Sequence, residues 1–433
     1  MSKKQGSNLP AIVVCLLLFG MISFVTNLAS PMGKVLENQF TVAEWLGKLG
    51  VFANFIAYAI MGIPAGLILQ KRGYKFTALT AIAVGFVGVA IQTVGGLLEG
   101  NLAFGVYLLG AFVAGFSMCM LNIVVNPMLN KLAGGGNRGN QLVQMGGSFN
   151  SLMGTAVIIL TGLLIPSLTE AKINQVFPLM YVALGIFALA FLVVLFTNIP
   201  ENPSVEAKVE EKSQYGPMSF RHFVLGAIAI FIYVGVEVGI PNLLQDWLNE
   251  TLTGDNATAI ASTVAGTYWF LMLVGRLAGA ALGAKVSAKS MLTVVSVAGL
   301  ALVLCAMYLD PANTINLPVF DGAKGFAMAS VPVNAALLVL CGLCTSVMWG
   351  GIFNLAVEGL GKYTEKGAGI FMAMVCGGGI LPLLQGVIVT ATKDTLQAGS
   401  YLASYWVVVA GLAFLLYYAL VGSKNVNKNI PTA

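Results

Sequence analysis

The sequence predicts an all-α polytopic membrane protein with twelve transmembrane helices arranged as two six-helix bundles. Of its 433 residues, 58% are hydrophobic and only 9% are charged, whereas about a quarter of the residues of a soluble domain are charged. Twelve apolar stretches are each long enough to cross a bilayer, which takes about 20 mostly apolar residues. The two halves of the chain also share weakly similar segments in the same order.

Charged, polar or proline-containing segments separate the apolar stretches and set their limits. The first stretch is too long for a cleaved signal peptide and lacks a small-residue cleavage pattern, so we interpret it as the first span. The predicted spans cover residues 10–30, 45–69, 76–98, 102–130, 140–165, 178–198, 222–246, 257–283, 290–309, 331–357, 367–391 and 400–422.

The distribution of positive charge predicts the orientation in the membrane. Sixteen Lys and Arg residues fall on the side of the N-terminus and five on the other side, while Arg276 lies inside the eighth span. The positive-inside rule then places both termini in the cytoplasm, and the even number of spans agrees. We expect a multi-pass protein of the plasma membrane, a bacterial inner membrane, that is a monomer in the lipid bilayer. The net charge of +5 is too modest to indicate a nucleic-acid partner.

The chain is predicted to consist of two halves joined by a linker. The longest polar segment, residues 199–221, mixes both charge signs with Pro and Gly, as flexible linkers do. It separates an N-terminal bundle, 1–198, from a C-terminal bundle, 222–433. Matched positions in the two halves differ by an offset that grows from 210 to 232 along the chain, which indicates a duplicated architecture with a few insertions in the second half.

Glu237 is the acid predicted to lie nearest the middle of a span. Apolar residues surround it in "IFIYVGVEVGIPNLL". A carboxylate at the bilayer centre costs several kcal/mol, so such residues usually face a wet cavity or a partner and mark a substrate or ion path. The repeat places Glu237 opposite Asn27, since both lie on the first helix of their half. A structural acid, hydrogen-bonded between two helices, is the alternative.

Amide side chains within the spans form a second group of candidates. An amide both donates and accepts hydrogen bonds, which suits a neutral polyhydroxylated ligand, although such groups also hold neighbouring membrane helices together. Trp349 precedes Gly350 and Gly351, a pair that could bend the tenth span, and its indole could stack on a sugar ring. The substrate-binding candidates are Glu237, Trp349, Asn27, Asn122, Asn126, Asn150, Asn354 and Gln385.

Four charged residues near the predicted cytoplasmic ends of spans are assigned gating or structural roles. Lys71 and Arg72 follow the small-residue segment "GIPAGLILQ" at the end of the second span. Arg276 and Glu358 lie at the same end of spans eight and ten, and either would be costly to bury alone. We therefore expect Arg276 and Glu358 to form a pair or share a network, with separate contacts to lipid headgroups as the alternative.

Nothing in the sequence predicts an enzyme. The single histidine, His222, lies at the mouth of the seventh span without a nucleophile or metal-binding cluster around it. The six cysteines all fall in apolar spans, where free cysteine usually acts as a small packing residue. We expect no cofactor and no metal.

Several strings of the sequence resemble the fucose permease family, the fucose-galactose-glucose:proton symporters of the major facilitator superfamily. They are "NFIAYAIMGIPAGLILQKRGYK", "LNIVVNPMLNKL", "GGSFNSLMGTA", "IFIYVGVEVGIPNLL" and "GGIFNLAVEGLGKYTEKGAGIFMAMVCGGGILP", and they occur in order over nearly the whole chain. The resemblance implies a twelve-helix fold and uptake of a monosaccharide by alternating access. It also implies substrate contact for Asn150.

This chain departs from the family pattern at the acids that the resemblance would assign to proton coupling. The first-span pattern Asn-Leu-x-Asp ends here in Ser30, and the fourth-span pattern Leu-Glu-x-x-x-Asn-Pro has Asn122 in place of Glu. Where the family pattern has a Gln shortly before Asn150, this chain has Gly147. Where the pattern has an Asp just before Lys71, this chain has Gln70. Glu237 is therefore the coupling candidate that remains.

These observations predict a secondary active transporter that imports a neutral hexose or deoxyhexose, such as glucose, galactose or fucose. Coupling to a proton or to sodium is expected, and uniport stays open because amides cannot release protons near neutral pH. Two alternatives remain. A multidrug-type exporter would have an aromatic, Met-rich cavity, and the chain has 18 Met. A sugar sensor that does not transport is favoured by the missing acids.

Overall fold

The computed structural model describes residues 9–40, 43–132, 136–165, 167, 170–199, 215–254, 256–282, 286–321, 325–427 and 429–431. Within these ranges, twelve helices are long and apolar enough to span a membrane, which confirms the predicted number of spans. Residues 200–214 of the predicted linker lie outside the described residues, so the limits of the two halves remain a prediction.

The first six spans come from four long helices and one shorter one, because α3 contains two spans. α1 continues ten residues beyond the predicted end of the first span, which carries Lys34 and Glu37 into helix rather than loop. The elements of this half are α1 Leu9–Phe40, α2 Glu44–Gly47, α3 Leu49–Gly95, α4 Gly100–Leu132, α5 Gly136–Leu164, η1 Ile173–Val176 and α6 Phe177–Phe196.

The second half has the same number of spans but more breaks. Spans ten, eleven and twelve are each built from two or more helical segments. The elements are η2 Pro217–Ser219, α7 Arg221–Thr251, α8 Ala257–Leu282, α9 Ala288–Tyr308, β1 Thr314–Asp321, β2 Gly325–Pro332, α10 Val333–Thr345, α11 Met348–Val357, η3 Gly361–Tyr363, α12 Thr364–Met374, α13 Gly377–Leu396, α14 Gly399–Ser404, α15 Trp406–Tyr417 and η4 Tyr418–Gly422.

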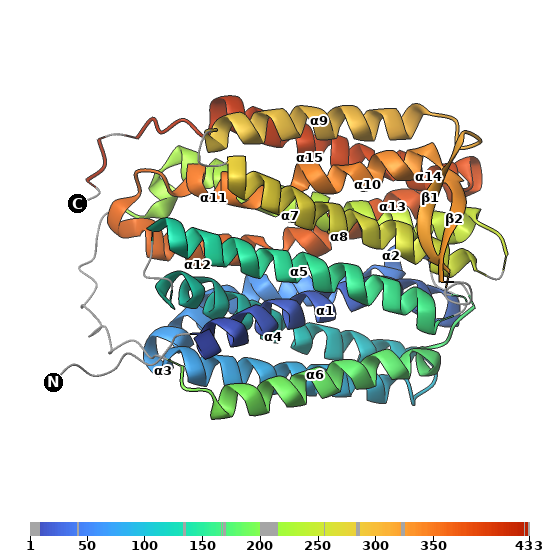
Figure 1. Cartoon of the computed structure of the whole chain (residues 1–433), viewed down its shortest axis with the longest axis horizontal. Helices are drawn as coiled ribbons and strands as arrows, with labels where there is room; N and C mark the ends of the chain where they lie inside the picture. The colour runs from blue at the N-terminus through green and yellow to red at the C-terminus, as the bar shows by residue number, and fades with distance from the viewer. Residues whose placement is uncertain are drawn as a thin grey trace.

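The long helices run side by side in two groups. Figure 1 shows α1, α3, α4, α5 and α6 in one group and the helices from α7 onward in the other, with the start of α1 and the end of η4 at the same end of the bundle. α5 packs against α8 across the boundary between the groups, and α3 packs against α12 and α13. These contacts give two six-helix bundles, as predicted.

A single glycine separates the second span from the third. Gly73 has φ 81° and ψ 179° in the middle of α3. Residues that carry a Cβ atom rarely adopt this backbone conformation. The helix therefore kinks at Gly73, close to the junction of span two, Leu49–Leu69, with span three, Lys71–Gly95.

The tenth span bends at a different place from the one predicted. Its helix breaks at Ser346 and Val347, before Trp349, whereas Gly350 and Gly351 lie inside α11. The Ser346 hydroxyl donates to the carbonyl of Leu343 at 2.6 Å. Such a side-chain bond competes with the helical backbone bond, which explains why the break occurs at the hydroxyl-bearing residue rather than at the glycines.

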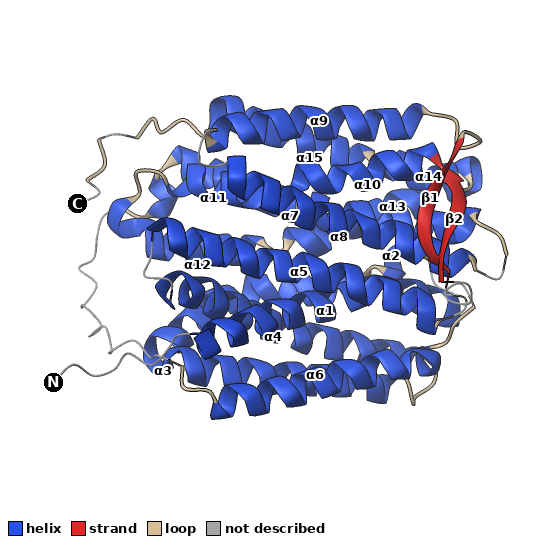
Figure 2. Ribbon diagram, in the orientation of Figure 1, coloured by secondary structure: helices blue, strands red, loops and turns tan. Residues whose placement is uncertain are grey.

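The segment between spans nine and ten, for which no strand was predicted, folds into a β-hairpin. β1 and β2 pair antiparallel from Thr314 opposite Pro332 to Asp321 opposite Gly325. The hairpin crosses the helix ends opposite the termini (Figure 2), and Thr263 on α8 donates to the carbonyl of Phe320 at 3.3 Å. It covers part of this end of the C-terminal bundle.

α7 is the most enclosed helix of the C-terminal half. Its residues 233–249 are all buried, and it packs against α8, α11, α13 and α15 as well as against α1 of the other half. In a bilayer, lipid contributes no hydrophobic drive for helix association, so close packing and polar contacts must provide it. Polar groups on α7 therefore face protein rather than lipid.

Close packing of α4 on α3 depends on Gly115. A Cβ atom at Gly115 would overlap the backbone oxygen of Asn54 and the side chain of Ala57, whereas a Cβ atom at Gly105 on the same helix meets nothing within 4 Å. We predict that Gly115→Ala destabilises the detergent-solubilised protein by about 1–3 kcal/mol. Gly105→Ala should instead stabilise it by about 0.5–1 kcal/mol, the usual helix preference. Thermal unfolding followed by intrinsic fluorescence measures both; equal shifts of the same sign would contradict this packing.

Candidate functional site

Glu237 lies midway along α7 and forms an ion pair. One of its carboxylate oxygens is 3.5 Å from Nη2 of Arg276 on α8, and each side chain is only 12% exposed. Nη1 of the same arginine donates to the carbonyl oxygen of Gly147 on α5, in the other half of the molecule. The buried carboxylate of Glu237 is thus paired with a cation, and this cation, Arg276, also connects the two bundles.

The structure does not bring Arg276 and Glu358 together, as the sequence analysis expected. Glu358 follows α11 and its side chain is exposed, while its backbone carbonyl lies 2.9 Å from Nε2 of His222. α7 and α8 are antiparallel around a short turn near Gly254, so residues at similar distances from this turn lie side by side. That spacing favours Glu237 as the partner of Arg276 and could have been read from the sequence.

A polar cluster surrounds Gly154 where α1, α5 and α8 meet. A Cβ atom at Gly154 would lie 3.2 Å from Nδ2 of Asn27 and 3.3 Å from the indole of Trp269. Asn27 donates to the backbone carbonyl of Ser23 at 2.9 Å. The indole Nε1 of Trp269 is buried and has no hydrogen-bond partner among the described residues. Trp269 is thus a donor close to Asn27 that the sequence analysis left unassigned.

Gln385 is buried in α13 and both polar atoms of its amide lack a partner in the described part of the chain. Its Oε1 faces Gly239 on α7, where a Cβ atom would collide with it. On the next turn of α7, Nδ2 of buried Asn242 is also unpaired within those residues. A buried polar atom without a hydrogen bond costs about 1–3 kcal/mol. These groups indicate a place where a polar ligand would supply the missing bonds.

Three of the predicted amides bind other parts of the protein instead. Asn122 donates to the Tyr58 hydroxyl on α3 at 2.9 Å, and Asn126 donates to the backbone carbonyl of Asn122. Asn150 on α5 contacts the carbonyl of Phe19 on α1 at 3.4 Å. The bonds of Asn122 and Asn150 hold neighbouring helices together, in agreement with the alternative function of membrane amides, whereas that of Asn126 stays within α4.

Trp349 and Asn354 lie on α11 in different surroundings. The Trp349 ring is half-buried and meets Tyr233 on α7 edge-on, with ring centroids 6.2 Å apart. Tyr233 is one turn before Glu237, so Trp349 borders the region of the ion pair. The Asn354 side chain is exposed and stays outside the buried polar groups.

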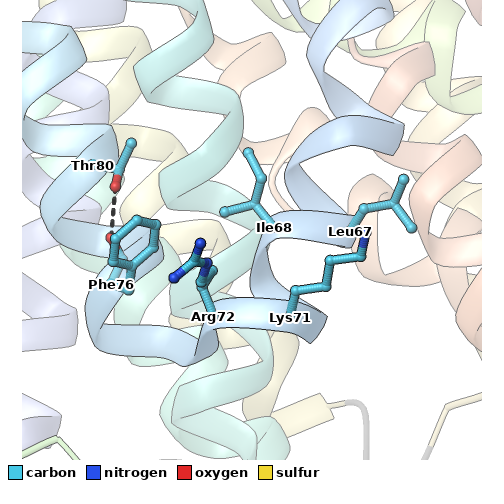
Figure 3. Close-up of a pocket in the computed structure, with 6 residues that line it drawn as sticks. All are labelled: Leu67, Ile68, Lys71, Arg72, Phe76 and Thr80. Carbon is cyan, nitrogen blue, oxygen red and sulfur yellow. Dashed lines mark hydrogen bonds between the residues drawn. The ribbon is translucent and has the colours of Figure 1, made fainter. Parts of the chain in front are cut away.

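Lys71 and Arg72 line a shallow groove at the kink of α3. Figure 3 shows the groove between the helix segments on either side of the kink, with Leu67, Ile68, Phe76 and Thr80 as the other lining residues. The Arg72 guanidinium lies 5.4 Å from the centre of the Phe76 ring. Within the ranges that the structure describes, neither cation pairs with a carboxylate. The gating or structural function of Lys71 and Arg72 therefore stays a prediction.

A cluster of charged residues that was not predicted from the sequence lies at the end of the bundle opposite the termini. Nζ of Lys34 is 3.2 Å from Glu37, 3.3 Å from Glu44 and 2.9 Å from Glu250. The members of this distal charge cluster are Lys34, Glu37, Glu44, Lys48, Asp246, Glu250, Lys393 and Tyr401.

The distal charge cluster joins the two halves. Lys34 also donates to the Tyr401 hydroxyl at 3.1 Å, and buried Lys48, at the start of α3, forms an ion pair with buried Asp246 on α7. The predicted spans ended at residues 30 and 246, which placed Lys34 and Glu37 in one loop and Glu250 in another. Opposite charges just beyond the ends of spans one and seven, on one side of the membrane, are the signal that could have revealed the cluster.

Comparison with known proteins agrees with this architecture. The family model described as Major Facilitator Superfamily matches residues 11–382. The glucose/galactose transporter of Brucella abortus is 29% identical over 417 residues, covering 94% of this chain and 93% of the relative. The L-fucose-proton symporter of Escherichia coli is 22% identical over 411 residues, covering 89% of this chain and 88% of the relative.

Solved structures share the fold at low sequence identity. The crystal structure of the E. coli fucose:proton symporter has a TM-score of 0.67 at 19% identity and covers 97% of this chain and 100% of that one. A partially occluded, inward-open structure of the E. coli xylose transporter has a TM-score of 0.71 at 12% identity, covering 96% and 100%. With twelve spans in two bundles and a family model matching most of its length, the chain belongs to the Major Facilitator Superfamily.

Proposed function

We propose that this protein imports a neutral hexose or deoxyhexose across the membrane by alternating access, coupled to a cation. The relatives named as glucose/galactose transporter and L-fucose-proton symporter match nearly the full length of the chain. The observation that carries the proposal within the structure is the set of buried amide and indole groups without partners. Sugar hydroxyls both donate and accept, so one ligand class satisfies all of them.

The proposed sugar site lies between α1, α7, α8 and α13. Gln385 faces Gly239, two residues from Glu237, which is about 3 Å along the helix axis. Trp269 is seven residues from Arg276 on α8, about 10 Å along the axis, and it lies close to Asn27. The groups that lack partners among the described residues therefore lie within about 10 Å of the depth of the ion pair. This placement suits one site that holds both the ligand and the coupling groups.

For coupling we propose Glu237, and for the coupling ion a proton, as in the relatives named proton symporters. Loss of the Glu237 charge on protonation would leave the Arg276 guanidinium without its carboxylate, while it still holds the carbonyl of Gly147 in the other half. Protonation would in this way change a contact between the bundles. We further propose an inner membrane location with cytoplasmic termini and a monomeric state.

Sugar counterflow tests the proposed activity directly. Purified protein in liposomes loaded with unlabelled sugar should accumulate the same labelled sugar for at least one member of a panel of hexoses, deoxyhexoses and amino sugars. An imposed pH gradient should then accelerate net uptake, whereas a sodium gradient should not. Absence of counterflow for the whole panel would refute transport of monosaccharides. Counterflow combined with net uptake that neither gradient accelerates would refute coupling and indicate uniport.

Glu237→Gln should separate coupling from sugar binding. The neutral amide cannot release a proton, so uptake driven by a pH gradient should fall about tenfold or more, the effect of losing one charged hydrogen bond, while counterflow is largely retained. The matched control is Glu358→Gln, because Glu358 is exposed and outside the site; it should leave both rates unchanged. Equal losses of gradient-driven uptake and counterflow in Glu237→Gln would contradict a coupling function.

Gln385→Leu should affect stability and affinity in opposite directions. Leucine removes two buried polar atoms that have no partner among the described residues, so the sugar-free protein should be more stable by about 1 kcal/mol or more. The Michaelis constant for the sugar should rise about fivefold or more, the effect of one lost hydrogen bond of about 1 kcal/mol. Thermal unfolding and uptake kinetics measure the two effects.

Gln245→Leu is the control for Gln385→Leu. The Gln245 amide is equally buried but donates to the Ser262 hydroxyl at 3.0 Å, so its replacement should destabilise the protein by about 1 kcal/mol. A loss of stability in Gln385→Leu comparable to that in Gln245→Leu would show that Gln385 has a structural function rather than a binding function.

A further inference from the structure

The distal charge cluster contains more negative than positive groups. With every group ionised, its acids outnumber its amines by one, and the only other polar member is the Tyr401 hydroxyl. Most of these side chains are buried, where an uncompensated charge is costly. The amines are those of Lys34, Lys48 and Lys393, and the carboxyl groups are those of Glu37, Glu44, Asp246 and Glu250.

One buried oxygen in the cluster needs a donor. Oε2 of Glu44 is 3.3 Å from Nζ of Lys34 and accepts from the Tyr401 hydroxyl at 3.0 Å. Oε1 of Glu44 is buried and has no partner in the described residues. Nζ of Lys34 is 3.2 Å from Glu37 and 3.3 Å from Glu44, so the two carboxyl groups meet at one ammonium group. If Glu37 is protonated, its hydroxyl can donate to this oxygen.

We propose that the distal charge cluster binds one proton, shared between Glu37 and Glu44, and that this proton favours closure of the two halves at this end. The bound proton makes the cluster electrically neutral and supplies the donor that Glu44 lacks. Lys34 and Glu37 belong to the N-terminal half, whereas Glu250 and Tyr401 belong to the C-terminal half. Closure therefore brings together groups whose charges sum to zero only when the proton is bound.

The surroundings of Glu44 support Glu37 as the residue that carries the proton. Burial opposes ionisation of Glu44, but the ammonium groups of Lys34 and Lys48 outweigh it, and the pKa of Glu44 falls to about 2. Glu44 thus remains an acceptor at any physiological pH. The proton then resides on the neighbouring carboxyl group and points toward Glu44.

The consequence is a gate that responds to pH on its own side of the membrane. The charge distribution predicts that this end faces the outside. The closed conformation binds one proton more than the open one, so raising the external pH should favour opening by up to about tenfold per pH unit. The proton enters and leaves on the same side, which makes this site distinct from the coupling group proposed at Glu237. This inference rests on the alternating access proposed above.

The distance between the two halves at this end tests the proposal. Spin labels are attached to cysteines introduced at exposed positions 99 and 308 of a cysteine-free variant, since Glu99 and Tyr308 lie at this end of the two halves. Double electron–electron resonance without sugar should show a longer-distance population that grows as the pH rises from about 5 to 9. Glu37→Gln should abolish this pH dependence and keep the short distance, because the glutamine amide donates to Glu44 permanently.

Two further variants make the test specific. Glu44→Gln also removes the surplus negative charge and should likewise abolish the pH response, which covers the case in which Glu37→Gln fails to fold. Glu170→Gln, at an exposed carboxylate on the same side, should behave as the parent protein. A pH response that persists in Glu37→Gln and Glu44→Gln would overturn the proposal, as would its absence from the parent protein.

The sugar hypothesis and the gate hypothesis can fail independently. Because the distances are recorded without substrate, a pH-dependent distance combined with no sugar counterflow would refute the proposed substrate and retain the gate. Sugar counterflow combined with a pH-independent distance would refute the gate and retain the transporter. Glu237→Gln should keep the pH-dependent distance change, which separates this proton from the coupling proton.

Discussion

The high cost of leaving a polar group unpaired in a hydrocarbon environment determines much of this structure. Backbone groups satisfy that constraint by forming helices along almost every span, and the strands lie only at the end of the bundle. Charged side chains satisfy it by pairing. Glu237 is held by Arg276, and Lys48 by Asp246, each pair buried between helices. The buried groups that stay unpaired among the described residues, such as those of Gln385 and Trp269, are therefore the informative ones.

The spans could be predicted because length and hydropathy alone specify a transmembrane helix. Hydropathy determines the end of a helix less well. Where protein rather than lipid surrounds the end of a helix, its residues need not be apolar, so the helix can continue beyond the apolar stretch. α1 continues to Phe40 because its last turns pack on the other half through Lys34 rather than on lipid. The β-hairpin was beyond the reach of the hydropathy pattern, because its residues lie outside the spans and pair through the backbone.

Site residues were harder to predict than spans because a polar side chain in a span has two possible functions that only contacts distinguish. Asn27 and Asn122 look equivalent in the sequence, yet Asn122 binds Tyr58 on a neighbouring helix, while Asn27 lies beside an indole donor that lacks a partner. Arg276 could be paired with either of two acids until the antiparallel packing of α7 and α8 selected Glu237. The distal charge cluster combines groups from six segments, so no local pattern describes it.

The positions of the acids limit how a proton could be coupled to transport. Every acid between residues 37 and 198, that is Glu37, Glu44, Glu99 and Glu170, lies at the end opposite the termini or in a segment beyond it. The N-terminal half therefore offers amides but no carboxylate at the depth of the proposed sugar site. The proposed coupling through a carboxylate at that depth therefore requires a group of the C-terminal half, and Glu237 is the acid there. Because Arg276 contacts both Glu237 and Gly147, the proposed coupling group is also the carboxylate whose charge bears directly on a contact between the two halves.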